Sequence, residues 1–199
     1  GYGLGTPQHL EALAAADANA GRVADVVQEL NRAGEDLLLL VASDHGHETV
    51  RNIVDLEALL IEAGFKEDRD SHECVVASQG LSAFIYLAEN TPKRVSEIAA
   101  WLDDVDGVGT VHTGEGLIAL GHRADGALAI AVDGVKVKDV NAYGIAGMSD
   151  AFFDRFSLET QSGIGQHGGL GRNEQHPFLI AIGNSFPAAT EYSHTSSAV

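Results

Sequence analysis

The chain has 199 residues, 45% of them apolar, and a formal net charge of −17. This length and composition allow a sizeable core in one large domain or two small ones, whereas the charge argues against a nucleic-acid or anionic-membrane partner. A small anionic substrate is still allowed, because bound metal ions can dominate the local field. The single cysteine, Cys74, excludes an internal disulfide and a cysteine-based zinc site. No apolar run approaches the roughly 18 residues of a membrane span, and no signal peptide is visible.

The chain opens with a glycine-rich loop that leads into a long helix. Thr6 is a good N-cap, and Pro7 is a good first helical residue. Apolar residues then recur at helical spacing, and Gly34 is a typical helix terminator. The sequence therefore predicts a helix over residues 7–33.

A continuous apolar run over residues 37–42 is followed at once by polar residues. Such a run predicts a strand buried on both faces, as in a parallel sheet, and ligands bind beyond the carboxyl ends of such strands. Asp44 and His45 fall at that point, and a carboxylate beside an imidazole suits zinc or a similar divalent ion. Gly46 lets the chain turn so that both side chains can converge on one ion. The alternative is a polar turn in which Asp44 caps the next helix.

The middle of the chain alternates short strand and helix patterns. The patterns predict helices over 54–63 and 92–102, strands over 74–77, 81–88 and 128–132, and a hairpin of 108–112 with 116–120. This order suggests a compact α+β unit of ferredoxin-like type. His112 and His122 are expected to be partly exposed histidines at strand ends. Residues 139–156 are expected to return the chain to the main domain.

Near the end of the chain, glycines surround His167 in the segment 162–175. Their small size lets the backbone approach an ion or phosphate closely. Arg172 and Glu174 are expected either to orient this loop or to form a surface ion pair. The alternative for His167 is a loop histidine bonded to backbone. Residues 177–183 predict a last buried strand.

Two of these segments carry a resemblance to a known family. Ser43-Asp44-His45-Gly46 resembles the second-metal motif of the alkaline phosphatase superfamily, and most of all of its type I phosphodiesterase/nucleotide pyrophosphatase branch. The segment around His167 resembles the Gly-X-His-Gly motif whose histidine completes the first metal site. The resemblance implies an α/β fold with an alkaline-phosphatase-like core sheet, helices on both of its faces and an inserted α+β (ferredoxin-like) cap. Residues 1–50 and 140–199 would belong to the metal-binding core, and residues 51–139 to the cap.

The resemblance also implies a chemistry. Two divalent ions, zinc or alternatively manganese or magnesium, would act on a small phosphate-ester substrate. Asp44 and His45 would hold the ion on the nucleophile side and His167 the other ion, with His47, Arg172 and Glu174 as possible supporting residues. The Thr or Ser nucleophile and three further metal ligands would lie outside this chain. We therefore expect the C-terminal part of a larger enzyme, which needs its N-terminal remainder and is inactive alone.

Two alternatives are left open by the sequence. The chemistry could be another of the superfamily, as in a phosphomonoesterase, phosphonate hydrolase, phosphomutase or sulfatase. The chain could instead be a non-catalytic module with an incomplete metal site.

Overall fold

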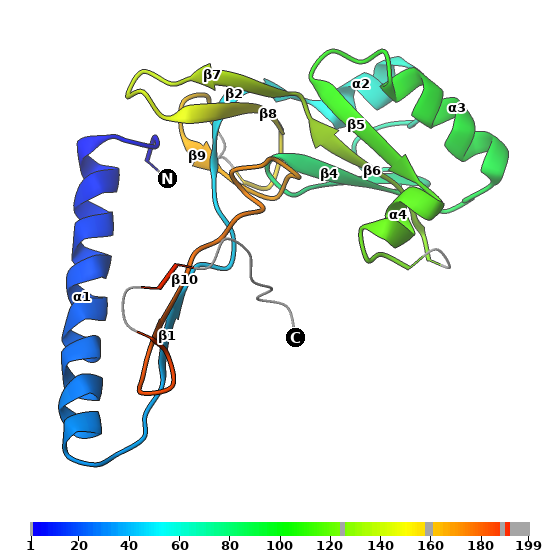
Figure 1. Ribbon diagram of the computed structural model, residues 1–199. Helices are drawn as coiled ribbons and strands as arrows, with labels where there is room; N and C mark the ends of the chain where they lie inside the picture. The colour runs from blue at the N-terminus through cyan, green and yellow to red at the C-terminus, as the bar shows by residue number, and fades with distance from the viewer. Residues whose placement is uncertain (1, 124–125, 158–160, 188–189, 192–199) are drawn as a thin grey trace.

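The computed structural model describes residues 2–123, 126–157, 161–187 and 190–191 (Figure 1). These residues form a mixed α/β fold. The elements in chain order are α1 (Pro7–Arg32), β1 (Leu39–Ala42), β2 (Glu48–Val54), α2 (Leu56–Glu62), β3 (Cys74–Ser78), β4 (Ser82–Leu87), α3 (Pro92–Leu102), β5 (Val108–Thr113), α4 (Glu115–Ala119), β6 (Leu128–Gly134), β7 (Lys136–Val140), β8 (Ala146–Phe152), β9 (Gly165–Gln166) and β10 (Leu179–Ile182). Within the described ranges the strands form a ribbon β1-β10 and two four-stranded sheets, β7-β8-β2-β9 and β3-β4-β6-β5. None of the described helices is long and apolar enough to cross a bilayer.

The first helix agrees with its prediction. The Thr6 side chain accepts a hydrogen bond from the His9 amide, Pro7 occupies the first turn, and α1 ends at Arg32. Figure 1 shows α1 running alongside the β1-β10 ribbon, away from the β3-β4-β6-β5 sheet. None of its side chains is buried in the described structure.

The strand after α1 differs from its prediction. β1 is not part of a parallel sheet but pairs antiparallel with β10, with Leu39 opposite Ile182. Leu40 is 55% exposed, and Leu179 and Ile180 of β10 are exposed as well. An apolar run predicts a strand, but its burial depends on the layers that cover the sheet, and a two-stranded ribbon covers neither face.

The sequence analysis missed all four strands of the β7-β8-β2-β9 sheet, which is mixed parallel and antiparallel. β2 lies at its centre, parallel to β8 and antiparallel to β9, and β7 pairs with β8. The β-branched pairs Thr49-Val50 and Ile53-Val54 favour a strand here. The helix α2 starts only at Leu56, where Asp55 accepts a hydrogen bond from the Ala58 amide.

The β3-β4-β6-β5 sheet, which we call the cap sheet, is antiparallel throughout. Its strands over 74–77, 81–88 and 128–132 and the helix α3 lie where the sequence predicts them. One face packs on α2 and α3 through a core that includes Leu56, Leu60, Ile85, Ile98 and Leu102.

The predicted hairpin of 108–112 with 116–120 is wrong. Residues 115–119 form the short helix α4, in which the Ile118 amide donates to the Gly114 carbonyl. β5 pairs with β6 instead, because the apolar segment of β6 forms a central strand with a neighbour on each side. The division into a core of 1–50 and 140–199 and a cap of 51–139 stays a prediction.

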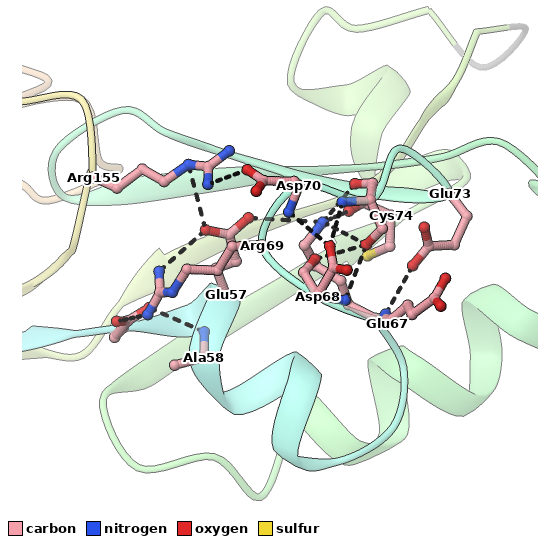
Figure 2. Close-up of polar contacts among 12 residues, drawn as sticks. Glu57, Ala58, Glu67, Asp68, Arg69, Asp70, Glu73, Cys74 and Arg155 are labelled. Atoms are coloured by element: carbon pink, nitrogen blue, oxygen red, sulfur yellow. Dashed lines mark hydrogen bonds and ion pairs between the residues drawn. The ribbon is translucent and has the colours of Figure 1, made fainter.

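A charged loop over residues 66–73 is fixed to α2 by buried and half-buried ion pairs (Figure 2). Lys66 is only 3% exposed, and its Nζ donates to the carbonyls of Ser71 and Cys74 at 2.7 and 2.6 Å. Arg69 pairs with Glu57. Figure 2 shows Arg155, from the segment after β8, reaching both Glu57 and Asp70 of the loop. The loop is therefore held from two sides.

The buried thiol of Cys74 predicts how the stability of the protein depends on pH. Burial raises the pKa of the Cys74 thiol above its ordinary value of 9.0, with nearby Lys66 opposing the shift. A thiol whose pKa is raised by folding contributes stability that is complete below pH 9.0 and is lost as pH rises through the folded-state pKa. Urea unfolding at about pH 7 and about pH 10 should show a larger alkaline loss of stability in the wild type than in Cys74→Val. Equal losses in the two proteins would contradict the assignment.

Candidate metal centre and the adjoining cavity

The missed strand β2 brings the two histidine motifs together. In the antiparallel pairing of β2 with β9, Thr49 lies opposite Gly165 and Glu48 opposite Gln166. Continuing this register by one residue sets His47 opposite His167. The loop after β1 and the glycine-rich loop therefore meet at the same end of the mixed sheet.

A second contact holds the two loops at a short distance. The Gly46 amide donates to the Glu174 carbonyl at 2.9 Å. A Cβ on Gly46 would lie 1.9 Å from the Asn173 carbonyl oxygen, so any side chain at this position would push the loops apart. Gly46 is therefore required for this close packing.

Three imidazoles cluster at this junction. The rings of His45 and His167 stack, with centroids 4.2 Å apart and an interplanar angle of 9°. His47 lies edge-on to both, at 5.3 and 5.4 Å. The structure thus brings together all three histidines that the sequence analysis singled out here.

The contacts of His45 place one of its ring nitrogens beside a carboxylate. Its Nδ1 lies 2.9 Å from the Gly46 carbonyl, which can only accept, so Nδ1 donates this hydrogen bond and Nε2 is left for another partner. Nε2 lies 3.5 Å from Oδ2 of Asp44. A carboxylate beside an imidazole is a donor set that zinc accepts. Asp44 is followed by β2 and not by a helix, so it does not serve as a helix cap.

The donors of this chain do not make a closed metal site. No group of three or more His, Cys, Asp or Glu side chains in the described part of the chain is arranged to hold a metal ion. Structural zinc sites are four-coordinate. Asp44 with His45 on one side and His167 on the other thus offer only part of a coordination shell.

The environment of His47 favours its neutral form. Partial burial lowers the pKa of His47 most, and His167 and His45 lower it further, whereas Asp44 raises it. A neutral imidazole is the form that binds metals or accepts a hydrogen bond.

Glu174 holds the glycine-rich loop through hydrogen bonds to its backbone amides. It is 2% exposed, and its carboxylate accepts hydrogen bonds from the amides of Gly169 and Gly171 at 2.7 and 3.0 Å. Lys136 lies 3.4 Å from the same carboxylate. Of the two alternatives for Glu174, the contacts are those of a loop-orienting residue. Arg172 is exposed, and its suggested supporting role stays a prediction.

The sequence analysis missed other residues that hold this loop. Glu48 is buried and accepts hydrogen bonds from Ser149 and from Asn173. Asp133 accepts one from the Leu170 amide at 3.0 Å, and Ser82 donates to the Gly168 carbonyl. For Glu48, the one signal in the sequence was a carboxylate at the start of the β-branched segment that forms β2. Asp133 and Ser82 gave no such signal, because they lie far from the loop in the sequence.

A cavity of about 290 Å³ opens beside the stacked histidines. His45 and His167 line the cavity together with Phe84, His112, Leu120 and His122 from residues 51–139. His112 lies in β5 and is partly buried, as expected, whereas His122 follows α4 and is not at a strand end.

The sequence model of the type I phosphodiesterase / nucleotide pyrophosphatase family matches residues 1–140. The chain belongs to this family. The match includes the Asp44-His45 motif, whereas His167 lies beyond it. Among curated proteins, none matches the chain.

A solved structure shows the same fold. The chain is similar to phosphonoacetate hydrolase from Sinorhizobium meliloti 1021 in complex with phosphonoformate, with a TM-score of 0.51 and 19% identity, over 82% of this chain and 40% of that chain. The same enzyme in complex with phosphonoacetate gives a TM-score of 0.49 at the same identity and coverage. The chain therefore spans 40% of the length of the structure it matches. The alkaline-phosphatase-like α/β fold is confirmed, whereas helices on both faces of a core sheet and the ferredoxin-like form of the cap stay predictions.

Proposed function

We propose that this chain forms part of a two-metal phosphate-ester hydrolase, a phosphodiesterase or nucleotide pyrophosphatase, whose Thr or Ser nucleophile comes from outside these residues. The observation that supports the proposal most is the stacking of His45 on His167 at the wall of a cavity. These two residues come from the two motifs of the family resemblance.

In this proposal Asp44 and His45 hold one divalent ion and His167 holds the other. Zinc fits the mixed oxygen and nitrogen donors, and manganese or magnesium are alternatives. Bound ions of this kind activate a nucleophilic oxygen and offset the charge of the phosphoryl oxygens. The hydrogen bond between His45 Nδ1 and the Gly46 carbonyl holds the ring with its Nε2 3.5 Å from Asp44 Oδ2.

The remaining residues of the site fix positions. Glu174 holds the amides of Gly169 and Gly171, and its own carbonyl binds the Gly46 amide. One residue thereby sets the position of both histidine loops. Hydrogen bonds from neighbouring groups to metal-binding loops commonly change metal affinity by about 10-fold to 100-fold when they are lost.

The test is a calorimetric titration of the chain with Zn²⁺. We expect binding to the wild type and a loss of affinity of about 10-fold or more in His45→Ala and in His167→Ala. His72→Ala is the matched control, because His72 is an exposed histidine in the 66–73 loop. Absence of Zn²⁺ binding by the wild type, or equal binding by all four proteins, would reject the proposal in favour of a non-catalytic module.

A second measurement tests the external nucleophile. The chain alone should not hydrolyse bis(4-nitrophenyl) phosphate, even with Zn²⁺ present. Tight binding of two ions together with turnover by the isolated chain would contradict that part of the proposal.

A further inference from the structure

One face of the cap sheet lines the cavity of the candidate site and contacts the loop of His167. In its register Phe84 and His112 both lie opposite Ala131, so these three side chains form one row on one face. Ser82 and Asp133 form the next row on that face, and they hold the loop of His167. The opposite face, with Ala83 and Val132, packs into the core.

The row of Phe84, Ala131 and His112 lines the cavity beside the stacked histidines. Ala131 is small, so it leaves space between the aromatic ring and the imidazole. His122 completes this side, with its ring edge-on to Phe84 at a centroid distance of 5.0 Å. A ligand held at His45 and His167 that is larger than a phosphoryl group would extend onto this row.

His112 has an unused polar atom. Its Nε2 is buried and has no hydrogen-bond partner in the described structure. A buried polar atom without a partner is unfavourable, which favours a ligand able to accept or donate a hydrogen bond there.

The charges around the cavity disfavour an anionic group at this end. The lining carboxylates, Asp133 and Glu174, both lie near Lys136, so that cation is already paired. No lysine or arginine belongs to the described residues that line the cavity. An anion bound near Phe84 would therefore be without a counter-charge.

The cavity volume matches a small organic group. About 290 Å³ is at the small end of the range of ligand pockets, roughly 300–1,000 Å³. The cavity thus fits about one ring beside a phosphoryl group, and the rest of a longer ligand would extend beyond it.

We propose that Phe84, His112, Leu120 and His122 form the subsite for the organic group of the ester, and that this group is an uncharged aromatic ring with a hydrogen-bond partner for His112. The inference rests on the proposed function, because the phosphoryl group must lie at His45 and His167. The ring packs against Phe84 and Leu120, and the two cap histidines contact its polar substituent.

The experiment follows the imidazole NMR signals of the ¹⁵N-histidine-labelled chain. The probes are 4-nitrobenzyl alcohol, which is uncharged, and 4-nitrobenzoate, which has the same ring and a negative charge. We expect the alcohol to shift the signals of His112 and His122, and the benzoate to bind about tenfold more weakly. Unchanged His112 and His122 signals, or equal affinity for the two probes, would overturn the proposal.

Variants test the role of the imidazole. His112→Phe keeps a ring but removes Nε2, and it should weaken binding of the alcohol about fivefold. His122→Ala, at a more accessible position, should also weaken it, and His72→Phe should not. Thermal unfolding of each variant checks that the fold is retained. Wild-type affinity in both cap variants would overturn the assignment.

Zn²⁺ separates failure of this subsite from failure of the proposed function. With Zn²⁺ bound, 4-nitrobenzyl phosphate should shift the signals of His45 and His167 together with those of His112 and His122. Shifts of His45 and His167 alone would reject the subsite and keep the hydrolase proposal. A lack of any response of these two histidines to Zn²⁺ would reject the hydrolase proposal itself.

Discussion

Replacement of Lys66 by methionine is expected to lower the free energy of unfolding by about 3–5 kcal/mol. The Nζ atom donates to the carbonyls of Ser71 and Cys74 and lies 3.7 Å from the Glu57 carboxylate. Methionine fills similar space but leaves these acceptors without their donor in a buried position. Removing one partner of a buried charged group is costly because the remaining partners stay desolvated.

Urea unfolding of the wild type and Lys66→Met measures this effect. Lys93→Met is the matched control, because the Lys93 side chain is 83% exposed and pairs with Glu97 on the surface of α3. The control should change the free energy of unfolding by about 0.5 kcal/mol or less. A loss below about 1 kcal/mol in Lys66→Met would show that Lys66 does not hold the loop.

Replacement of Glu174 by glutamine is expected to lower the free energy of unfolding by about 1.5–3 kcal/mol and to loosen the loop of His167. Both carboxylate oxygens accept hydrogen bonds from loop amides, so the NH₂ of glutamine would face an N–H donor. Lys136 would also lose one of its two negative partners. Because the Glu174 carbonyl binds Gly46, the disturbance should reach the Asp44-His45 loop as well.

Amide hydrogen exchange provides the most direct measurement for Glu174→Gln. The amides of Gly169 and Gly171 should exchange faster than in the wild type, and Zn²⁺ affinity should fall about tenfold. Glu115→Gln, a change at an exposed carboxylate of α4, should leave both quantities as they are. Unchanged exchange at Gly169 and Gly171 would contradict the loop-orienting role of Glu174.

Local sequence patterns predicted the elements that depend on near neighbours. The helix α1 follows from Thr6, Pro7 and the apolar spacing after them, and α3 follows in the same way from Thr91 and Pro92. Short motifs likewise pointed to Asp44, His45 and His167 as candidate ligands, because glycines and metal-ligating residue types are visible in the sequence itself. The family match then agreed with the resemblance that these motifs carry.

The strand pairings and the cavity could not be predicted in this way. The pairing of β1 depends on the distant strand β10. Residues 116–120 do not form a strand, because β6 takes the place beside β5. Glu48, Asp133 and Lys136, which hold the loop of His167, lie far apart in the chain. No local sequence pattern indicates contacts between such distant residues.

The sequence by itself determined which side chains are present at the candidate metal centre, and it determined the helices whose caps and apolar spacing lie within a few turns. Only the tertiary structure decided that His47 and His167 lie opposite each other, because this follows from the register of β2 with β9. It also decided that a row of cap residues faces the same cavity. The physical reason is that sheet register and burial are set by contacts between distant segments, whereas caps and helical periodicity are set by residues close together in the chain.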